Sequence, residues 1–285
     1  MLNSAPNTEN VVESVAEDIE CRAQQLLMHH GGLEATEFLR ILITKEFVDR
    51  ITLVSSFGSE SAVLLHMVSR IDKNLPILFL NTGKLFPETL RYRDQLVQLL
   101  GLTDVREIGV KRVEIERKDA NGELWSVDPD SCCYFRKVVP LHEALKKFDA
   151  WITGRKRYQS ASRAHLLRVE AADGKIKVNP IADWGGDDVR KYFSTVGLPP
   201  HPLESDGYLS IGCVTCTERV VLGQDARSGR WSGTDKTECG IHTRLETSAQ
   251  SVPVRAWKKS VASAASEAMV MSQSDVVSVK DGESG

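Results

Sequence analysis

Apolar residues recur along the chain with two spacings, and the two spacings predict different elements. Residues 11–30 and 33–47 carry apolar positions at the helical period, and Gly31-Gly32 between them stops the first helix. Short apolar runs rich in β-branched residues predict buried strands at residues 51–55, 76–80, 105–110 and 150–153. Further helical patterns occupy residues 62–69, 87–100, 112–120, 132–147 and 187–196.

The alternation of strands and helices sets the expected fold class, which is α/β. Repeated βα units favour a mainly parallel sheet with helices on both faces. Residues 166–170 and 175–179 flank Asp173-Gly174, a dipeptide that predicts a β-hairpin. Ligands of such sheets bind beyond the carboxyl ends of the strands, so the loops that follow the predicted strands are the candidates for a binding site.

Two of these loops have a composition that suits an anion. Residues 56–61 (SFGSES) join a strand to a helix N-terminus, where free backbone N–H groups and the helix dipole favour negative charge. This loop is neither a Walker A motif nor G-x-G-x-x-G, and a plain βα turn explains it equally well. Residues 154–163 form a basic loop that can bind phosphate or sulfate, although a charge run is more often a solvated surface.

The cysteines form two pairs that lie far apart in the sequence. Cys132 and Cys133 are adjacent, and their Cα atoms are therefore about 3.8 Å apart, below the roughly 4.4 Å lower limit usual for a disulfide. Consecutive side chains diverge, so this pair also suits a single tetrahedral zinc poorly. Together with Cys213 and Cys216 it suits a cluster of several irons, because each thiolate then binds a different metal atom.

Composition and charge exclude several classes of protein. The chain has 285 residues, of which 41% are hydrophobic, and its net charge of −3 argues against a general nucleic-acid binder, since such domains carry a basic excess. No apolar run approaches the roughly 20 residues that a membrane span needs. Residues 1–20 lack Lys and Arg, which argues against a signal or transit peptide. We therefore expect a cytoplasmic protein whose cysteines are metal ligands or catalytic thiols.

Several motifs, in the right order, resemble the assimilatory phosphoadenylyl-sulfate/adenylyl-sulfate reductases. They read NTGKLFPET at 81–89, NPIADW at 179–184, GYLSIGC at 207–213 and ECGIH at 238–242, of which the last is the most specific. The resemblance covers nearly everything from residue 55 to residue 243. Asn81 replaces an Asp that is usual in the family, Thr215 replaces a common Pro, and residues 155–158 (RKRY) vary around the family's Arg-Arg-Asp/Glu.

Both cysteine pairs together resemble the four-iron four-sulfur adenylyl-sulfate reductases within this family. The resemblance implies an adenine-nucleotide α-hydrolase-like fold and one 4Fe-4S cluster on Cys132, Cys133, Cys213 and Cys216. It also implies reduction of adenylyl sulfate (APS) to sulfite and AMP in sulfate assimilation and cysteine biosynthesis. Cys239 is the implied nucleophile: it forms a thiosulfonate, from which reduced thioredoxin or a glutaredoxin releases sulfite.

An anionic substrate needs cationic partners, and the chain offers several. Arg227 and Arg230 are spaced so that both can face one ligand. Lys137, four residues after Cys133, is expected on the same helical face and between the cluster and the sulfate. His242 and the arginines of the substrate site are expected to supply positive charge to the Cys239 thiolate. The predicted substrate site comprises Ser56, Phe57, Gly58, Ser59, Glu60, Ser61, Thr82, Gly83, Lys137, Gly154, Arg157, Arg163, Arg227, Arg230 and His242.

Four regions are expected along the chain. They are a helical lead-in (1–50), a nucleotide-binding and iron–sulfur reductase domain (51–233), a mobile segment with the catalytic cysteine (234–244) and a flexible tail (245–285), in which residues 254–269 have a weak helical pattern. Whether the protein forms a homo-oligomer stays open.

Three other functions compete with this prediction. The nearest is the same reaction on phosphoadenylyl sulfate (PAPS), which some cluster-bearing relatives also accept. A second is an ATP-using PP-loop transferase, against which the ECGIH motif argues. A third is a non-enzymatic iron–sulfur or zinc regulator, which would need a basic DNA-binding element that the net charge does not offer.

Overall fold

A computed structural model of the chain describes residues 8–221, 223–234 and 236–242, with side chains from residue 17 onward. The predicted tail at 245–285 and its weak helix at 254–269 lie outside the described residues. Within the described ranges, no helix combines the length and the apolar character needed to cross a membrane.

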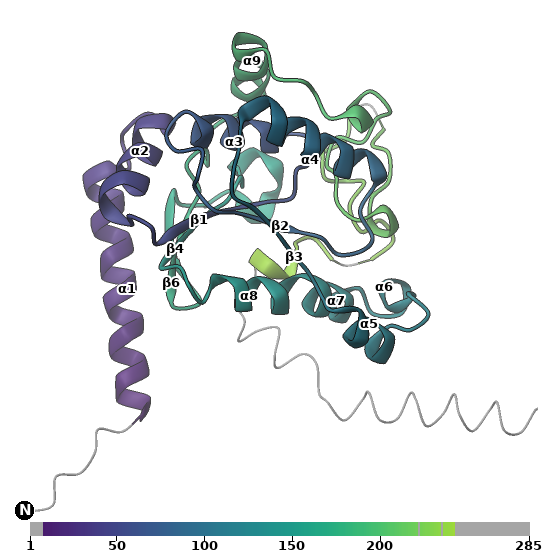
Figure 1. The fold of residues 1–285 in the computed structure, drawn as a ribbon, viewed down its shortest axis with the longest axis horizontal. Coiled ribbons are helices and arrows are strands. Elements are labelled where there is room, and N and C mark those ends of the chain that lie inside the picture. Colours follow the sequence, from purple (N-terminus) through teal and green to yellow (C-terminus); the bar gives the residue numbers. More distant parts are fainter. Residues whose placement is uncertain (1–7, 222, 235, 243–285) are drawn as a thin grey trace, which may run out of the picture. The chain divides into compact units, whose positions relative to one another are not determined.

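The centre of the molecule is a six-stranded sheet with the strand order β3-β2-β1-β4-β6-β5 (Figure 1). The strands are β1 (Ile51–Ser55), β2 (Ile77–Leu80), β3 (Val105–Ile108), β4 (Ala150–Ile152), β5 (Val169–Ala172) and β6 (Lys175–Val178). All neighbours are parallel except β5, which runs antiparallel to β6. The chain moves from β1 outward to β2 and β3, and then returns to the other side of β1 as β4. The strand order therefore reverses between β1 and β4, where sheets of this kind bind ligands.

Helices cover both faces of this sheet (Figure 1). On one side lie α2 (Ala35–Ile41), α3 (Ser61–Ser69), α4 (Pro87–Leu100) and α9 (Gly186–Val196). On the other side lie α5 (Arg112–Lys118), α6 (Leu124–Val127), α7 (Pro129–Cys133) and α8 (Val139–Leu145). The long helix α1 (Thr8–His30) packs against β5 and β6 at the edge of the sheet.

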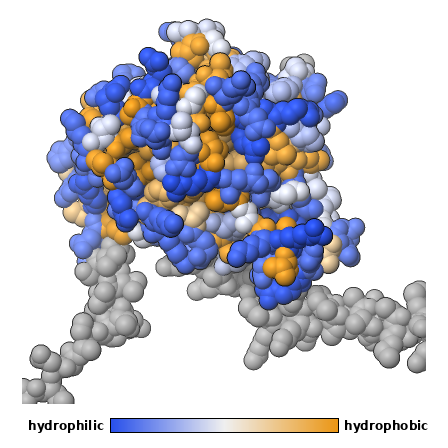
Figure 2. All heavy atoms as spheres, viewed as in Figure 1, coloured by the Kyte–Doolittle hydropathy of each residue, from blue (hydrophilic) through white to orange (hydrophobic). Residues whose placement is uncertain are grey.

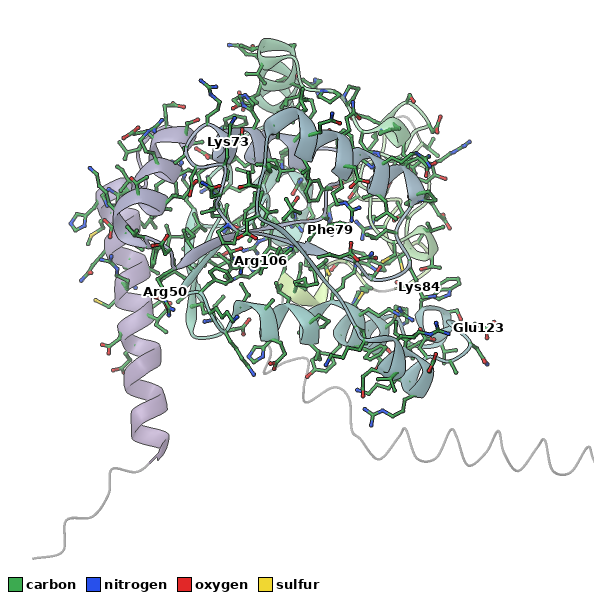
Figure 3. The ribbon with its side chains drawn as sticks, viewed as in Figure 1. Arg50, Lys73, Phe79, Lys84, Arg106 and Glu123 are labelled. Atoms are coloured by element: carbon green, nitrogen blue, oxygen red, sulfur yellow. The ribbon has the colours of Figure 1, made fainter. Side chains whose placement is uncertain are left out.

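Side chains of β2 enter two separate apolar clusters because successive strand residues point to opposite faces. Phe79, which Figure 3 labels near the centre of the sheet, belongs with Leu65 and Phe38 to the larger cluster. Leu78 joins Trp151 and the α8 residues in the smaller cluster. Polar residues cover most of the molecular face that Figure 2 shows, with apolar residues in narrow patches between them.

The predicted α/β fold is confirmed, and the hairpin turn at Asp173-Gly174 has the two positive φ angles, 51° and 71°, of a type I′ turn. The helix predicted over 132–147 is present without a break from α7 to the end of α8 at Leu145, but a π-helical turn (Tyr134–Val138) joins the two. Pro140 lies just after the wide turn, and a proline nitrogen cannot donate the backbone hydrogen bond that a regular α-helix would require there.

Candidate active site

A cavity lies at the carboxyl ends of β1 and β4, where the strand order reverses. Its lining comes from the end of β1 and the loop after it (residues 53–56 and 58–61) and from the end of β4 and the loop after it (residues 151, 153–156, 158, 159 and 163). Residues 209–212, 226, 227, 230, 231, 238, 239, 241 and 242 also contribute to the lining, and Lys137 enters from the π-helical turn. The cavity thus brings together stretches that are distant in the sequence.

The loop after β1 is fixed from both ends. Phe57 adopts a positive φ of 48°, is fully buried and packs edge-on against Phe79 at 5.3 Å between ring centroids. At the other end, the Glu60 carboxylate accepts hydrogen bonds from Lys156 Nζ at 2.8 Å and Gln159 Nε2 at 2.7 Å. Burial opposes the charge of Glu60, but Lys156, Tyr158 and Gln159 together outweigh it and lower the Glu60 pKa. Glu60 therefore joins the loops after β1 and β4 into one rigid wall.

Most residues of the predicted substrate site line this cavity. The twelve that do so, counting the predicted nucleophile, are Ser56, Gly58, Ser59, Glu60, Ser61, Lys137, Gly154, Arg163, Arg227, Arg230, Cys239 and His242. Their roles in binding or catalysis stay predictions.

Four predicted substrate residues lie away from the cavity. Phe57 is buried in the core, as described above. The Thr82 hydroxyl lies 3.2 Å from Cys213 Sγ, and the Gly83 amide donates to Asn81 Oδ1 at 2.9 Å. Arg157 is exposed, and its Nε donates to the Leu166 carbonyl at 2.9 Å. The printed contacts of Thr82, Gly83 and Arg157 are therefore made with other parts of the protein and not within the cavity lining.

Sequence reasoning missed several residues of the lining. Arg155, Lys156, Tyr158 and Gln159 come from the basic loop after β4, and residues 209–212 come from the approach to Cys213. The basic composition of the loop signalled that a cation faces the site, but the sequence alone did not indicate which of them. The structure brings Arg155, Lys156 and Arg163 to the cavity and leaves Arg157 outside it.

The cations of the cavity divide into two groups by their partners. Arg163 and Arg227 both bond the Glu238 carboxylate, and Arg155 is paired with Glu170. By contrast, no carboxylate of the described chain lies within ion-pair distance of Lys137 or Arg230. The Arg230 guanidinium lies 4.5 Å from the centroid of the Trp231 ring. Lys137 and Arg230 therefore supply the uncompensated positive charge of the cavity.

Several buried polar atoms of the lining have no hydrogen-bond partner in the described structure. They are the Nε atoms of Arg155, Arg227 and Arg230, Nε1 of Trp231 and Nδ1 of His242. Arg155 and Arg227 already bond Glu170 and Glu238 through other nitrogens. Because buried polar groups are normally paired, the unpaired nitrogens of Arg230, Trp231 and His242 favour a ligand rich in acceptor oxygens, such as a phosphate or sulfate ester.

Cys239 lies inside this cationic environment and is only 9% exposed. A hydrogen bond from the Cys133 thiol lowers the pKa of Cys239, burial opposes this effect, and the nearby charges of Lys137 and Arg230 add to the lowering. The contributions of Lys137 and Arg230 to this lowering do not depend on a proton on Cys133.

The expectation that His242 supplies positive charge to Cys239 is wrong. Burial lowers the pKa of His242 well below its usual value, and the surrounding cations Lys177 and Arg155 lower it further. The imidazole is thus neutral at pH 7 and stacks parallel to the Trp151 ring, with 6.4 Å between centroids. The cations that lower the pKa of Cys239 are Lys137 and Arg230, of which Arg230 is one of the arginines expected in this role.

The two cysteine pairs, 132–133 and 213–216, are electrostatic neighbours of each other and of Lys137. Cys132 and Cys133 end α7, whereas Cys213 precedes and Cys216 ends a short 3-10 turn (Val214–Cys216). An isolated β-bridge joins Cys213 to Leu85, and the Val214 amide donates to the Lys84 carbonyl at 2.8 Å. Lys84 in turn donates to the Gly122 carbonyl at 2.5 Å, on the side of the molecule where Figure 3 labels Lys84 and Glu123.

A search against known protein families matches residues 50–219 to the phosphoadenosine phosphosulfate reductase domain. The chain belongs to this reductase family. Its relatives include the adenosine 5′-phosphosulfate reductase of Mesorhizobium japonicum, which is 46% identical over 224 residues, or 79% of this chain and 88% of the relative. The enzyme of the same name from Chelativorans sp. is 45% identical over 227 residues, with 79% and 92% of the two chains covered.

A solved reductase also shares the fold. The phosphoadenylyl-sulfate reductase from Candida auris, in a phosphate complex, superposes with a TM-score of 0.58 at 26% identity and covers 69% of this chain and 96% of its own. The predicted family and the adenine-nucleotide α-hydrolase-like fold are therefore confirmed. The Asn81 that departs from the family pattern donates to Glu107 Oε1 at 2.9 Å, so in this member of the reductase family it ties the end of β2 to β3.

Proposed function

We propose that the protein reduces adenylyl sulfate (adenosine 5′-phosphosulfate) to sulfite and AMP, with a reduced thioredoxin or glutaredoxin as the electron donor. The observation that carries this proposal is the buried thiol of Cys239 in a cationic cavity at the reversal point of the sheet. The relatives at 45% and 46% identity that bear the name of this reductase support the choice of substrate. The pathway would be sulfate assimilation, which supplies cysteine biosynthesis.

In this proposal the two ends of the substrate meet different walls. The loop of residues 56–61 and Gly154 hold the adenosine and the α-phosphate, because α3 begins at Ser61 and its amino end favours negative charge. Lys137 and Arg230, the two cations without a carboxylate partner, hold the sulfate. The neutral His242 offers its unpaired Nδ1 to an oxygen of the substrate or of the intermediate.

The chemistry begins with attack of the Cys239 thiolate on the sulfur of the sulfate. The S–O bond to the α-phosphate breaks, and AMP leaves with its electron pair, so the protein carries a Cys–S–SO₃⁻ thiosulfonate. A thiolate of the external dithiol protein then attacks Cys239 Sγ and expels sulfite. Its second thiol resolves the mixed disulfide, which restores Cys239 and leaves the donor oxidised by two electrons.

We further propose that Cys132, Cys133, Cys213 and Cys216 hold one 4Fe-4S cluster. None of them is in a disulfide, and Cys132 interacts electrostatically with both Cys213 and Cys216. Among the described residues, no group of three or more His, Cys, Asp or Glu side chains is arranged to hold a metal ion. A cluster of several irons would give each of the four thiolates its own iron. The bound cluster would link α7 to the 213–216 turn and contribute to the electrostatics beside Lys137, whereas the electrons come from the dithiol.

Thiols that act as ligands and as a nucleophile require a reducing compartment, so we propose that the reaction occurs in the cytoplasm. Phosphoadenylyl sulfate is the alternative substrate, since the solved relative from Candida auris is named for it. Comparing turnover of the two nucleotides under identical conditions decides between them.

The decisive experiment measures sulfite release from adenylyl sulfate under anaerobic conditions with reduced thioredoxin. We expect Cys239→Ser to abolish sulfite release while nucleotide binding and the visible absorbance of the cluster persist. Cys21→Ser is the matched control, because Cys21 is exposed on α1 and lies outside the cavity. Turnover by Cys239→Ser would overturn the mechanism.

A further inference from the structure

Glu238 lies next to the nucleophile and is held by two arginines of the cavity wall. Arg163 donates from Nε and Nη2 to the two carboxylate oxygens at 2.7 and 2.8 Å, an arrangement that matches the planar guanidinium to the planar carboxylate. Arg227 adds a third bond at 3.1 Å. Arg163 is 6% exposed, so little water competes with these bonds.

The same carboxylate also bonds the backbone of the nucleophile. Glu238 Oε1 accepts the amide N–H of Cys239 at 2.9 Å. A second arginine contact reaches the preceding residue, since Arg227 Nη2 donates to the Thr237 carbonyl at 3.4 Å. The position of Cys239 Sγ in the cavity is thus tied to the position of the Glu238 carboxylate.

Arg163 is itself held by its own loop and, through it, by the loop after β1. It donates to Gln159 Oε1 at 2.5 Å, and Gln159 donates to Glu60 at 2.7 Å. A continuous set of hydrogen bonds therefore runs from Glu60 through Gln159 and Arg163 to Glu238, and from there to the Cys239 amide. In this arrangement the anionic partner of both Arg163 and Arg227 is the Glu238 carboxylate.

We propose that Glu238 is a positioning residue, which docks the Cys239 segment through Arg163 and Arg227, and that these two arginines recognise this carboxylate instead of the substrate. This inference rests on the proposed reductase function. It gives different roles to the two neighbouring arginines of residues 227–230, since Arg227 holds the segment whereas Arg230 remains for the sulfate.

Docking must also be reversible for the reaction to finish. Cys239 is 9% exposed when docked, so a protein dithiol reaches its sulfur only after the Glu238 bonds break. Loss of the Glu238 charge should therefore slow formation of the thiosulfonate, which needs the docked state, without slowing its cleavage by thioredoxin.

The test separates the two half-reactions. Adenylyl sulfate is mixed with excess protein without reductant, and thiosulfonate on the Cys239 peptide is followed by mass spectrometry. We expect Glu238→Gln and Arg163→Ala each to slow its formation by about tenfold, because a charge-assisted bond is lost in each. The double variant should be no slower than the slower single variant, since both changes break the same contact. The rate at which iodoacetamide labels Cys239 in the free protein should rise in both single variants.

Binding of adenylyl sulfate, measured in a Cys239→Ser background, gives the second readout. We expect Glu238→Gln, Arg163→Ala and Arg227→Ala to leave the affinity unchanged and Arg230→Ala to weaken it. Asp149→Asn is the control for loss of a charge, because Asp149 forms an exposed bidentate pair with Arg50 far from the cavity.

The outcomes that overturn the inference are distinct from failure of the proposed function. Absence of sulfite release by the unaltered protein refutes the function itself. If the unaltered protein reacts but Arg163→Ala or Arg227→Ala weakens nucleotide binding while Glu238→Gln does not, the arginines bind substrate and the inference is wrong. Additive effects in the double variant, or unchanged labelling of Cys239, refute it equally. If Arg163→Ala does not fold, Arg227→Ala serves in the same cycle.

Discussion

Replacing Gly212 by alanine should displace Arg230 without unfolding the protein. A Cβ built on Gly212 lies 2.3 Å from Arg230 Nη2, 2.5 Å from Cζ and 2.9 Å from Nη1. The guanidinium must therefore retreat by about 1 Å to reach ordinary contact distance. The clash falls on the far end of a flexible side chain and not on the backbone, so the side chain can move away. The φ angle of Gly212 is also not among the positive ones, so alanine adopts it without strain.

Gly212→Ala should have a small effect on stability and a large effect on the reaction rate, and the test compares these two effects. We expect the free energy of unfolding to change by no more than about 1 kcal/mol, because the gain in backbone rigidity from alanine offsets part of the lost packing. A misplacement of about 1 Å at a group that orients the substrate costs up to about a hundredfold in rate. We therefore expect Gly212→Ala to form the thiosulfonate more slowly than the unaltered protein but faster than Arg230→Ala.

Urea unfolding and the single-turnover assay measure these two quantities on the same preparation. Gly32→Ala is the control, because nothing lies within 4 Å of its added Cβ. A wild-type rate in Gly212→Ala, combined with an inactive Arg230→Ala, would show that the position of the guanidinium against Gly212 is irrelevant. A loss of several kcal/mol in stability would refute the argument that the clash falls on a flexible group alone.

Three further predictions concern stability and the metal site. Burial lowers the pKa of His201 to about 4. Between pH 6.5 and 4 the histidine of the unfolded state therefore binds a proton while that of the folded state stays neutral, and the free energy of unfolding should fall by up to about 3 kcal/mol. Urea titrations of His201→Gln should show a shallower decline over this pH range. Glu60→Gln should lower the free energy of unfolding by about 3 kcal/mol, since the fully buried Lys156 loses its partner. Adding Lys156→Met to this variant should restore part of that stability. If instead the destabilisations of the two single variants add in the double variant, the pairing of Glu60 with Lys156 is contradicted. Cys213→Ser should abolish the visible cluster absorbance and lower the iron content, whereas Cys21→Ser should change neither.

Local patterns were sufficient to predict most of the fold. β1 and α4 have the predicted bounds because a short β-branched run and a Pro87 start are signals that adjacent residues carry. The π-helical turn after Cys133 could not be predicted, since it depends on how the chain packs below the sheet and on one missing donor at Pro140. The order of the strands followed from no local pattern, and only the structure shows it.

The site was less predictable, because its contacts join residues distant in the sequence. Arg163 and Glu238 are separated by 75 residues, and nothing at either position indicates the other. The spacing of Arg227 and Arg230 predicted that both can face one ligand. Both line the cavity, but the Arg227 guanidinium bonds Glu238, whereas the Arg230 guanidinium lies over the Trp231 ring. Motif comparison recovers which residues gather at a site, whereas it does not reveal which charges are already neutralised there.

The neutrality of His242 follows from the same charges that make the cavity attractive to an anion. Arg155, Arg163 and Arg227 of the cavity lining, together with the neighbouring Lys177, raise the cost of a further proton on the buried imidazole, so burial and repulsion act in one direction. A histidine three residues from a nucleophilic cysteine suggests an imidazolium–thiolate pair, but that pair needs a site poor in other cations. Here the positive charge beside Cys239 comes from Lys137 and Arg230, whose side-chain types stay charged throughout the neutral pH range. The rate of thiosulfonate formation should therefore show no decline that tracks titration of a histidine above pH 7, and such a decline, lost in His242→Asn, would return His242 to the cationic role.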